Sequence, residues 1–212
     1  MRIGITGASG FIGSQLLSVL QSLGDRNVSP LERKNKNLAA TKEDLKEFVK
    51  NKDIVYHFGG VNRGTDDQIM DGNVKSIFNL IEALKAYGSE STHIVFSSSS
   101  QVYKLTRTNT PIKESRITEP SILYGITKKT AEDMIRLSGF PYTILRLSNV
   151  YGPGCRPYYN SVLATFCERA VGGLPLLING DGTQGRDFIY IDDVIRALIL
   201  AGSQKKDSTR HV

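Results

Sequence analysis

Apolar residues along the chain alternate between short continuous runs and stretches with helical spacing. The short runs predict strands at residues 1–6, 27–31, 54–58, 93–96 and 142–147. Helical spacing predicts helices over 11–23, from Thr41 onward, and over 67–87, 124–137, 161–171 and 194–201. Alternating strands and helices are typical of βαβ units with right-handed crossovers. The pattern therefore predicts an α/β protein with a Rossmann-like, doubly wound parallel sheet.

Composition narrows the class of protein. Of 212 residues, 40% are hydrophobic and 23% charged, which is ordinary for a soluble globular chain. No stretch reaches the ~20 apolar residues of a membrane span, and the N-terminal run is too short and Gly-rich for a signal peptide. The net charge of +6 comes partly from short basic clusters in predicted loops rather than a basic stripe. We therefore expect neither membrane nor nucleic acid as a partner.

The two cysteines are Cys155 and Cys167. Neither has a neighbouring Cys or His at metal-ligand spacing, so we predict packing thiols and no metal site. A disulfide framework would need more cysteines, and a reducing compartment, the cytoplasm, is the expected location.

Three glycines, spaced GxxGxxG, stand between the first predicted strand and the first helix. Gly7 permits a tight turn, Gly10 lets the backbone approach a pyrophosphate, and Gly13 lets helix and strand pack closely. Free N–H groups at the start of a helix bind such an anion. A plain glycine turn is the alternative. The predicted dinucleotide-binding turn consists of Gly7, Ser9, Gly10, Phe11, Ile12 and Gly13.

Glu32 and Arg33 follow the second predicted strand. A carboxylate there would bind the adenosine ribose hydroxyls and favour NAD, whereas an arginine would pair with a 2′-phosphate and favour NADP. A surface ion pair is also open. The two residues leave the choice between NAD and NADP undecided.

Tyr124 and Lys128 form a YxxxK pair downstream of a serine cluster at the end of the fourth predicted strand. Residues four apart share one face of a helix, so the ammonium lies near the phenol. A neighbouring cation and a positive nicotinamide ring favour the phenolate and would bring its pKa toward working pH. Such a tyrosine takes a proton from a sugar hydroxyl while hydride leaves the same carbon.

Taken together, the chain resembles the extended short-chain dehydrogenase/reductases, the NAD-dependent epimerase/dehydratase group that acts on nucleotide sugars. The resemblance covers nearly the whole chain. It rests on the glycine turn, His57-Phe58-Gly59-Gly60, Asn73-Val74, Ser97-Ser98-Ser99 with Val102-Tyr103, Tyr124 with Lys128, Arg146 to Gly154, Gly180 to Phe188, and Asp192-Asp193.

The resemblance implies roles for particular residues. Ser99, Tyr124 and Lys128 would form the catalytic set. Phe58, Gly59, Gly60 and Ser97 would line the dinucleotide, which Tyr124 and Lys128 also contact. Ser99, Asn149 and Arg186 would hold the nucleotide sugar, with Arg186 on its pyrophosphate. We expect residues 1–150 to be the NAD(P)-binding domain, and residues 151–212 to supply a small, incomplete substrate region interleaved with the last elements of that domain.

Some segments depart from the family pattern. Family dehydratases usually carry Asp-Glu after the hydroxyl donor, where this chain has Ser100-Gln101, which argues against 4,6-dehydration. The Asp-Leu or Asp-Val pair near the adenine is absent, since Leu38 has no preceding Asp. Segments at 60–63, 159–162 and 164–167 are similar to reductases of bacterial capsule sugar synthesis. Family members usually run well beyond residue 212.

Three functions follow from these observations. The first is a nucleotide-sugar epimerase, at C4 of a UDP- or dTDP-sugar, with transient hydride transfer to bound NAD. The second is an NADPH-dependent reductase of a keto-deoxysugar nucleotide. The third is a non-catalytic dinucleotide-sensing protein on the same fold. A homodimer through the helices at 67–87 and 124–137 is a further expectation from the family.

Overall fold

A computed structural model describes the chain except for residues 26, 32–39, 105–110, 160, 204–209 and 212. A parallel sheet in the order β2-β1-β3-β4-β5-β8 forms its centre. The strands are β1 (Ile3–Thr6), β2 (Val28–Pro30), β3 (Ile54–His57), β4 (His93–Ser99), β5 (Tyr142–Leu147) and β8 (Arg210–His211). The predicted Rossmann-like α/β class is confirmed.

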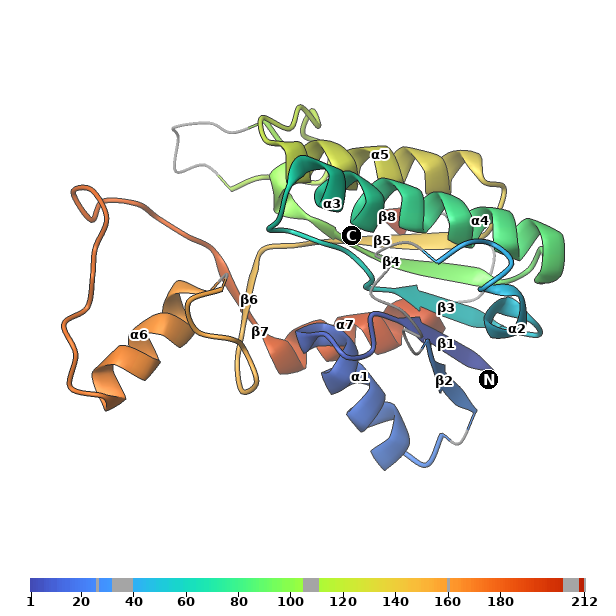
Figure 1. Ribbon diagram of the computed structural model, residues 1–212, viewed down its shortest axis with the longest axis horizontal. Helices are drawn as coiled ribbons and strands as arrows, with labels where there is room; N and C mark the ends of the chain where they lie inside the picture. The colour runs from blue at the N-terminus through green and yellow to red at the C-terminus, as the bar shows by residue number, and fades with distance from the viewer. Residues whose placement is uncertain (26, 32–39, 105–110, 160, 204–209, 212) are drawn as a thin grey trace.

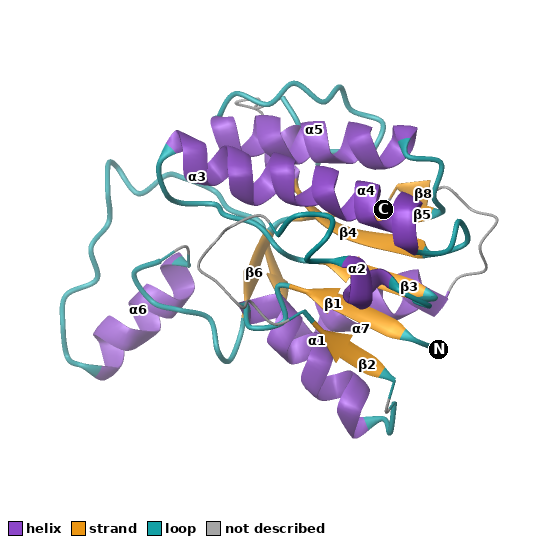
Figure 2. Ribbon diagram, turned by 45° about the vertical axis from the view of Figure 1, so that its right-hand side comes forward, coloured by secondary structure: helices purple, strands orange, loops and turns teal. Residues whose placement is uncertain are grey.

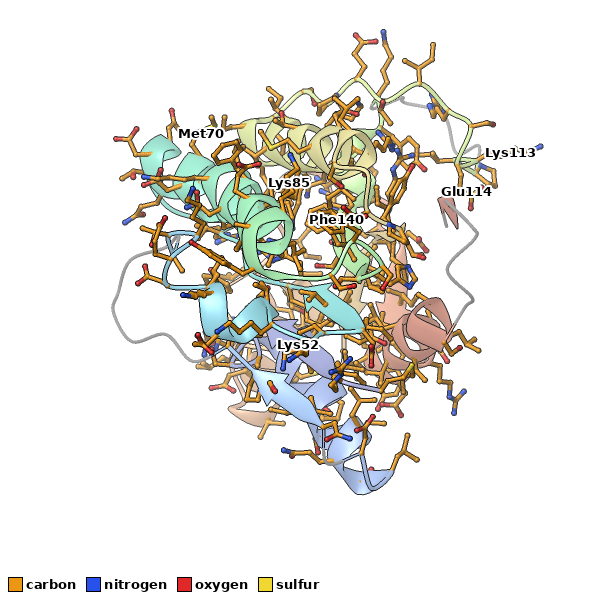
Figure 3. All side chains as sticks on the ribbon, turned by 90° about the vertical axis from the view of Figure 1, so that its right-hand side faces the viewer. Lys52, Met70, Lys85, Lys113, Glu114 and Phe140 are labelled. Atoms are coloured by element: carbon orange, nitrogen blue, oxygen red, sulfur yellow. The ribbon has the colours of Figure 1, made fainter. Side chains whose placement is uncertain are left out.

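Helices cover both faces of this sheet (Figures 1 and 2). One face carries α1 (Phe11–Ser22) and α7 (Ile191–Ser203), whose apolar sides pack with β1 and β4 around Leu16, Val95 and Val194. The other carries α2 (Lys46–Val49), α4 (Ser76–Tyr87) and α5 (Leu123–Leu137). Figure 3 shows Phe140 inside the molecule on that side, whereas Lys113 and Glu114 lie on the outer loop before α5. The buried strands are almost continuously apolar because helices shield both faces.

The long helix predicted at 67–87 is three pieces, which corrects the expectation of one continuous helix. These are α3 (Asp66–Met70), a π-helical turn η1 (Asp71–Lys75) and α4. A Cβ on Gly72 would lie 2.5 Å from Val61 Cγ2, so the glycine lets this turn approach the loop after β3. The π turn is common at functional sites and here turns Asn73 inward.

Regular helix does not begin at Thr41 either. Asp44 accepts hydrogen bonds from the Thr41 amide and hydroxyl, which closes a turn first, and α2 begins at Lys46. The cap pattern is present as predicted, yet the helix it precedes is one turn long.

Three short strands were not predicted, and one strand is longer than expected. β4 continues through the serines to Ser99, because these small residues pair with β5 up to Leu147. β6 (Asn149–Tyr151) and β7 (Phe188–Tyr190) form a separate two-stranded sheet. β8 pairs with β5 through Thr143 and Ile144.

Residues 152–159 and 161–187 belong to an arm that extends from the layered body and carries α6 (Val162–Val171) (Figures 1 and 2). No residue of α6 is buried. A cleft of about 650 Å³ lies between α6 and the loop after β6, and both Cys155 and Cys167 line it.

Candidate active site

The carboxyl ends of the parallel strands meet at one edge of the sheet. The chain runs from β1 outward to β2 and then returns to β3 on the other side of β1. In open α/β sheets a ligand binds in the crevice at this point, where the strand order reverses. The glycine turn follows β1, and the Phe58-Gly59-Gly60 loop follows β3, so both predicted cofactor segments lie at this point of the carboxyl edge.

The glycine turn has the shape that the sequence predicts. Gly7 has φ +69°, and a Cβ on it would lie 2.7 Å from the amide nitrogen of Gly59. A Cβ on Gly13 would overlap the carbonyl oxygen of Gly7. Gly10 is the N-cap of α1, and no described side chain caps this helix. Ser9 is exposed, and Phe11 and Ile12 begin the helix. A backbone cradle with uncapped N–H groups fits a pyrophosphate.

Hydrogen bonds that involve the last residues of β1 and β3 hold the loop after β3 in place. Thr6 Oγ1 accepts from the Gly59 amide at 3.2 Å and bonds His57 Nδ1 at 2.7 Å. His57 is buried, and burial together with the nearby Lys128 charge lowers its pKa to about 3, so the ring is neutral. These contacts fix Phe58 and Gly59 beside the glycine turn.

Asn73 joins the loop after β3 to α5. Its Oδ1 accepts from the Val61 amide at 2.9 Å, and its Nδ2 donates to the Val61 carbonyl at 2.7 Å and to Thr127 Oγ1 at 3.0 Å. A Cβ on Gly60 would lie 2.8 Å from Asn73 Oδ1. Asn73 was identified from sequence only as part of a motif, without a role. Gly72-Asn73 inside a helical pattern was the available signal.

The structure brings Ser99, Tyr124 and Lys128 to this edge. Ser99 ends β4 and Tyr124 lies in the first turn of α5. A Cβ on Gly125 would overlap the Gln101 carbonyl oxygen, so only glycine allows α5 to begin against the turn that follows Ser99. Lys128 is buried and donates from Nζ to the Ser97 carbonyl at 2.9 Å. The same Nζ lies 5.8 Å from the centre of the Tyr124 ring.

Burial shifts the pKa of Tyr124 and of Lys128. It raises the pKa of Tyr124 to about 12, with a smaller contribution from Tyr159, and lowers the pKa of Lys128 to about 8. The expected shift of the Tyr124 pKa toward working pH includes a positive nicotinamide ring beside the phenol and stays a prediction. Among the protein's own groups, desolvation is the largest cause of the raised pKa.

The two predicted sugar-nucleotide residues lie at the small sheet. Asn149 Nδ2 donates to the Asp187 carbonyl at 2.8 Å, which ties β6 to the start of β7. Arg186 precedes β7, is exposed, and donates to the Gly185 carbonyl. Asn149 thus has a structural contact of its own, and the binding role of both residues stays a prediction. Glu32, Arg33 and Leu38 lie outside the described residues.

Within the residues that the structure describes, no group of three or more His, Cys, Asp or Glu side chains is placed to hold a metal ion. No helix in the described ranges is both long and apolar enough to cross a membrane.

Comparison with known proteins identifies the family. The model of the NAD dependent epimerase/dehydratase family matches residues 3–212. The chain belongs to this family.

Relatives within the NAD dependent epimerase/dehydratase family carry different activities. A UDP-2-acetamido-2,6-beta-L-arabino-hexul-4-ose reductase from Pseudomonas aeruginosa is 30% identical over 94% of this chain and 49% of its own length. A putative UDP-glucose 4-epimerase from Methanocaldococcus jannaschii is 30% identical over 96% of this chain and 74% of its own. The chain therefore spans about half of the first relative and three quarters of the second.

Solved structures of family members superpose closely on this chain. MoeE5 in complex with UDP-glucose and NAD has a TM-score of 0.86 at 30% identity, covering 100% of this chain and 75% of that one. The UDP-glucose 4-epimerase of Thermotoga maritima with UDP-glucose has a TM-score of 0.85 at 28% identity, covering 100% and 76%. The resemblance to the extended short-chain dehydrogenase/reductases is confirmed.

Proposed function

We propose that the chain is the dinucleotide-binding part of an NAD-dependent nucleotide-sugar 4-epimerase, with a UDP-sugar as substrate. One observation carries this assignment: Lys128 Nζ donates to the Ser97 carbonyl and lies 5.8 Å from the centre of the Tyr124 ring, and a Cβ on Gly60, in the predicted cofactor loop, would lie 3.5 Å from it. The family description and relatives named UDP-sugar 4-epimerases support NAD and the uridine nucleotide. Residues 1–150 supply the cofactor site and the arm supplies part of the substrate region.

The chain's own residues have distinct tasks. The glycine turn and the Phe58-Gly59-Gly60 loop would hold NAD, which would supply a reversible hydride acceptor with a positively charged oxidised ring. Tyr124 as phenolate takes the proton of the sugar C4 hydroxyl and later returns it. Ser99 donates a hydrogen bond to the same sugar oxygen. The Lys128 ammonium stabilises the phenolate through its charge. Burial raises the pKa of Tyr124 to about 12, and a positive charge bound beside the phenol would favour the phenolate.

In the first experiment, the purified protein is denatured and any released dinucleotide is identified by mass spectrometry. In a second assay, the native protein is incubated with UDP-glucose or UDP-glucuronate and isomerisation of the sugar is measured. We expect released NAD and isomerised sugar with no net cofactor oxidation. Conversion that consumes NADPH in equal amount would replace the epimerase by the second candidate. That candidate, a reductase of a keto-deoxysugar nucleotide, is favoured by the relative from Pseudomonas aeruginosa, which covers 94% of this chain.

A homodimer is part of the proposal. Exposed apolar side chains occur on the helical layer opposite α1 and α7, among them Met70, Phe78 and Ile126. Light scattering on wild type and Phe78→Lys tests this face: we expect a dimer that the substitution converts to monomer. A monomeric wild type would contradict the proposed dimer.

A cytoplasmic location is proposed on the two free thiols, Cys155 and Cys167.

A further inference from the structure

The buried carboxylate of Glu132, on the same helix as Tyr124 and Lys128, takes no part in the mechanism proposed above. Glu132 is on α5, four residues after Lys128 and eight after Tyr124, so all three share one face of the helix. Its side chain is 0% exposed. An ionised group so deep in a protein is unfavourable unless donors compensate for the lost water.

Four hydrogen bonds compensate Glu132. Oε1 accepts from Ser98 Oγ at 2.6 Å and from Arg146 Nε at 2.9 Å. Oε2 accepts from Arg146 at 2.7 Å and from Arg136 at 2.8 Å. The Arg146 fork is two-pronged and is itself held by the Tyr103 hydroxyl at 2.9 Å. These donors lower the pKa of Glu132 against the effect of burial, so the carboxylate is ionised.

These contacts join three elements at the site. Ser98 on β4 and Arg146 on β5 are paired in register, and Glu132 bonds both from α5. Ser98 stands between Ser97, whose carbonyl accepts from Lys128, and Ser99, the predicted hydroxyl donor. Glu132 therefore ties the helix that carries Tyr124 to the strand that carries Ser99.

The charge of Glu132 also acts on Lys128. The groups that face this ammonium are neutral His57 from β3, Tyr124 and Glu132 from α5, and, beyond the carboxylate, Arg146 from β5 and Arg136 from α5. Burial lowers the pKa of Lys128 to about 8, and Glu132 opposes that shift.

We propose that Glu132 is a positioning residue of the active site: its carboxylate fixes α5 against β4 and β5 and places a negative charge one helical turn from the Lys128 ammonium. The effect on turnover rests on the proposed function, whereas the effect on Lys128 does not. The experiment separates the two.

The first readout is the titration of Lys128 itself, by NMR of lysines labelled at Cε, assigned with Lys128→Met. In Glu132→Gln, a near-isosteric change, we expect the Lys128 midpoint to fall by about one pH unit. Glu47→Gln is the matched control, since it removes the carboxylate of an exposed helix ion pair with Lys50. It should leave the midpoint unchanged. A folded Glu132→Gln with the wild-type midpoint overturns the electrostatic role.

The second readout is the pH profile of turnover. We expect the alkaline limb of kcat in Glu132→Gln to move to lower pH by the same amount, with a smaller change in KM. Glu132→Asp retains the charge and should restore the limb. A merely structural residue would lower kcat at every pH without moving the limb, which would also overturn the proposal.

Ser98→Ala keeps the proposal testable if Glu132→Gln does not fold. It leaves both arginine contacts and the charge in place and removes only the link to β4. We expect kcat to fall several-fold with an unchanged alkaline limb, and wild-type kcat would refute the positioning of α5. If no variant, wild type included, converts a nucleotide sugar while the Lys128 midpoint still shifts, the proposed function fails and the action of Glu132 on Lys128 stands.

Discussion

At the scale of single residues, burial shifts the pKa values of Tyr124 and Lys128 in opposite directions, and both shifts favour the neutral side chain. The phenol is harder to ionise than in water and the ammonium easier to deprotonate. Each shift disfavours the charged form that the proposed mechanism uses. A bound, oxidised nicotinamide ring would supply one compensating charge.

Removing the Tyr124 hydroxyl tests its role in proton transfer. Tyr124→Phe should reduce turnover by about 10²- to 10⁴-fold, because the phenol is the general acid and base. Binding of NAD, measured by calorimetry, should change little. Turnover that persists in Tyr124→Phe would assign the proton transfer to another group, and binding without turnover in wild type would indicate a dinucleotide sensor.

Lys128 makes stability depend on pH in a defined window. Its folded pKa, about 8, lies below the unfolded value of 10.5, so between these values the unfolded state binds more protons and stability rises with pH. Above about pH 10 the raised pKa of Tyr124 acts in the opposite direction. Relative to Lys128→Met, wild type should therefore gain about 2–3 kcal/mol between pH 8 and 10. Urea denaturation at each pH measures this, and equal slopes for both proteins would contradict it.

At the scale of elements, strands and helices were predictable where the period was clear. Burial on both faces gave apolar runs for β1, β3 and β5, and α5 begins and ends within one residue of its predicted bounds. The break in the helix at Gly72 was not predictable from periodicity, since a π turn shifts the pattern by one residue only.

The candidate site also has features that could be predicted from the sequence and features that could not. The glycine turn and the YxxxK pair depend on local spacing, which a sequence displays directly. The links made by Asn73 and Glu132 depend on partners far along the chain, such as Val61 and Arg146, which only the fold brings together. Glu132 had one available signal, a carboxylate on the inward face of the helix four residues after Lys128.

The contact between the glycine turn and α1 gives a prediction for an element. Gly13→Ala should destabilise the fold by about 1–3 kcal/mol and weaken NAD binding, because the added methyl overlaps the Gly7 carbonyl and displaces the turn. Gly185→Ala is the control, since a Cβ there meets nothing within 4 Å. Thermal melts and calorimetry report both effects, and a Gly13→Ala protein with wild-type affinity would contradict the cradle.

At the scale of the whole molecule, the arm and the layered body differ in their packing. Leu174, Leu177 and Ile178 are exposed, whereas the sheet is covered on both faces. Regions with few buried contacts open at low free energy. In hydrogen exchange on this chain, amides of residues 174–187 should exchange within seconds and those of β4 only on global unfolding. Slow exchange in the arm would show that a partner surface covers it.

The core beneath α1 is assembled from the two ends of the sequence. Leu16 and Leu20 pack with Val194 and Leu198, which follow 178 residues later. On a ribosome adding ~5–20 residues per second, the first helix emerges roughly 9–36 s before its partner. During that interval the apolar face of α1 is not covered by α7. Variants that slow elongation before α7 should therefore increase chaperone dependence without altering the stability of the finished protein.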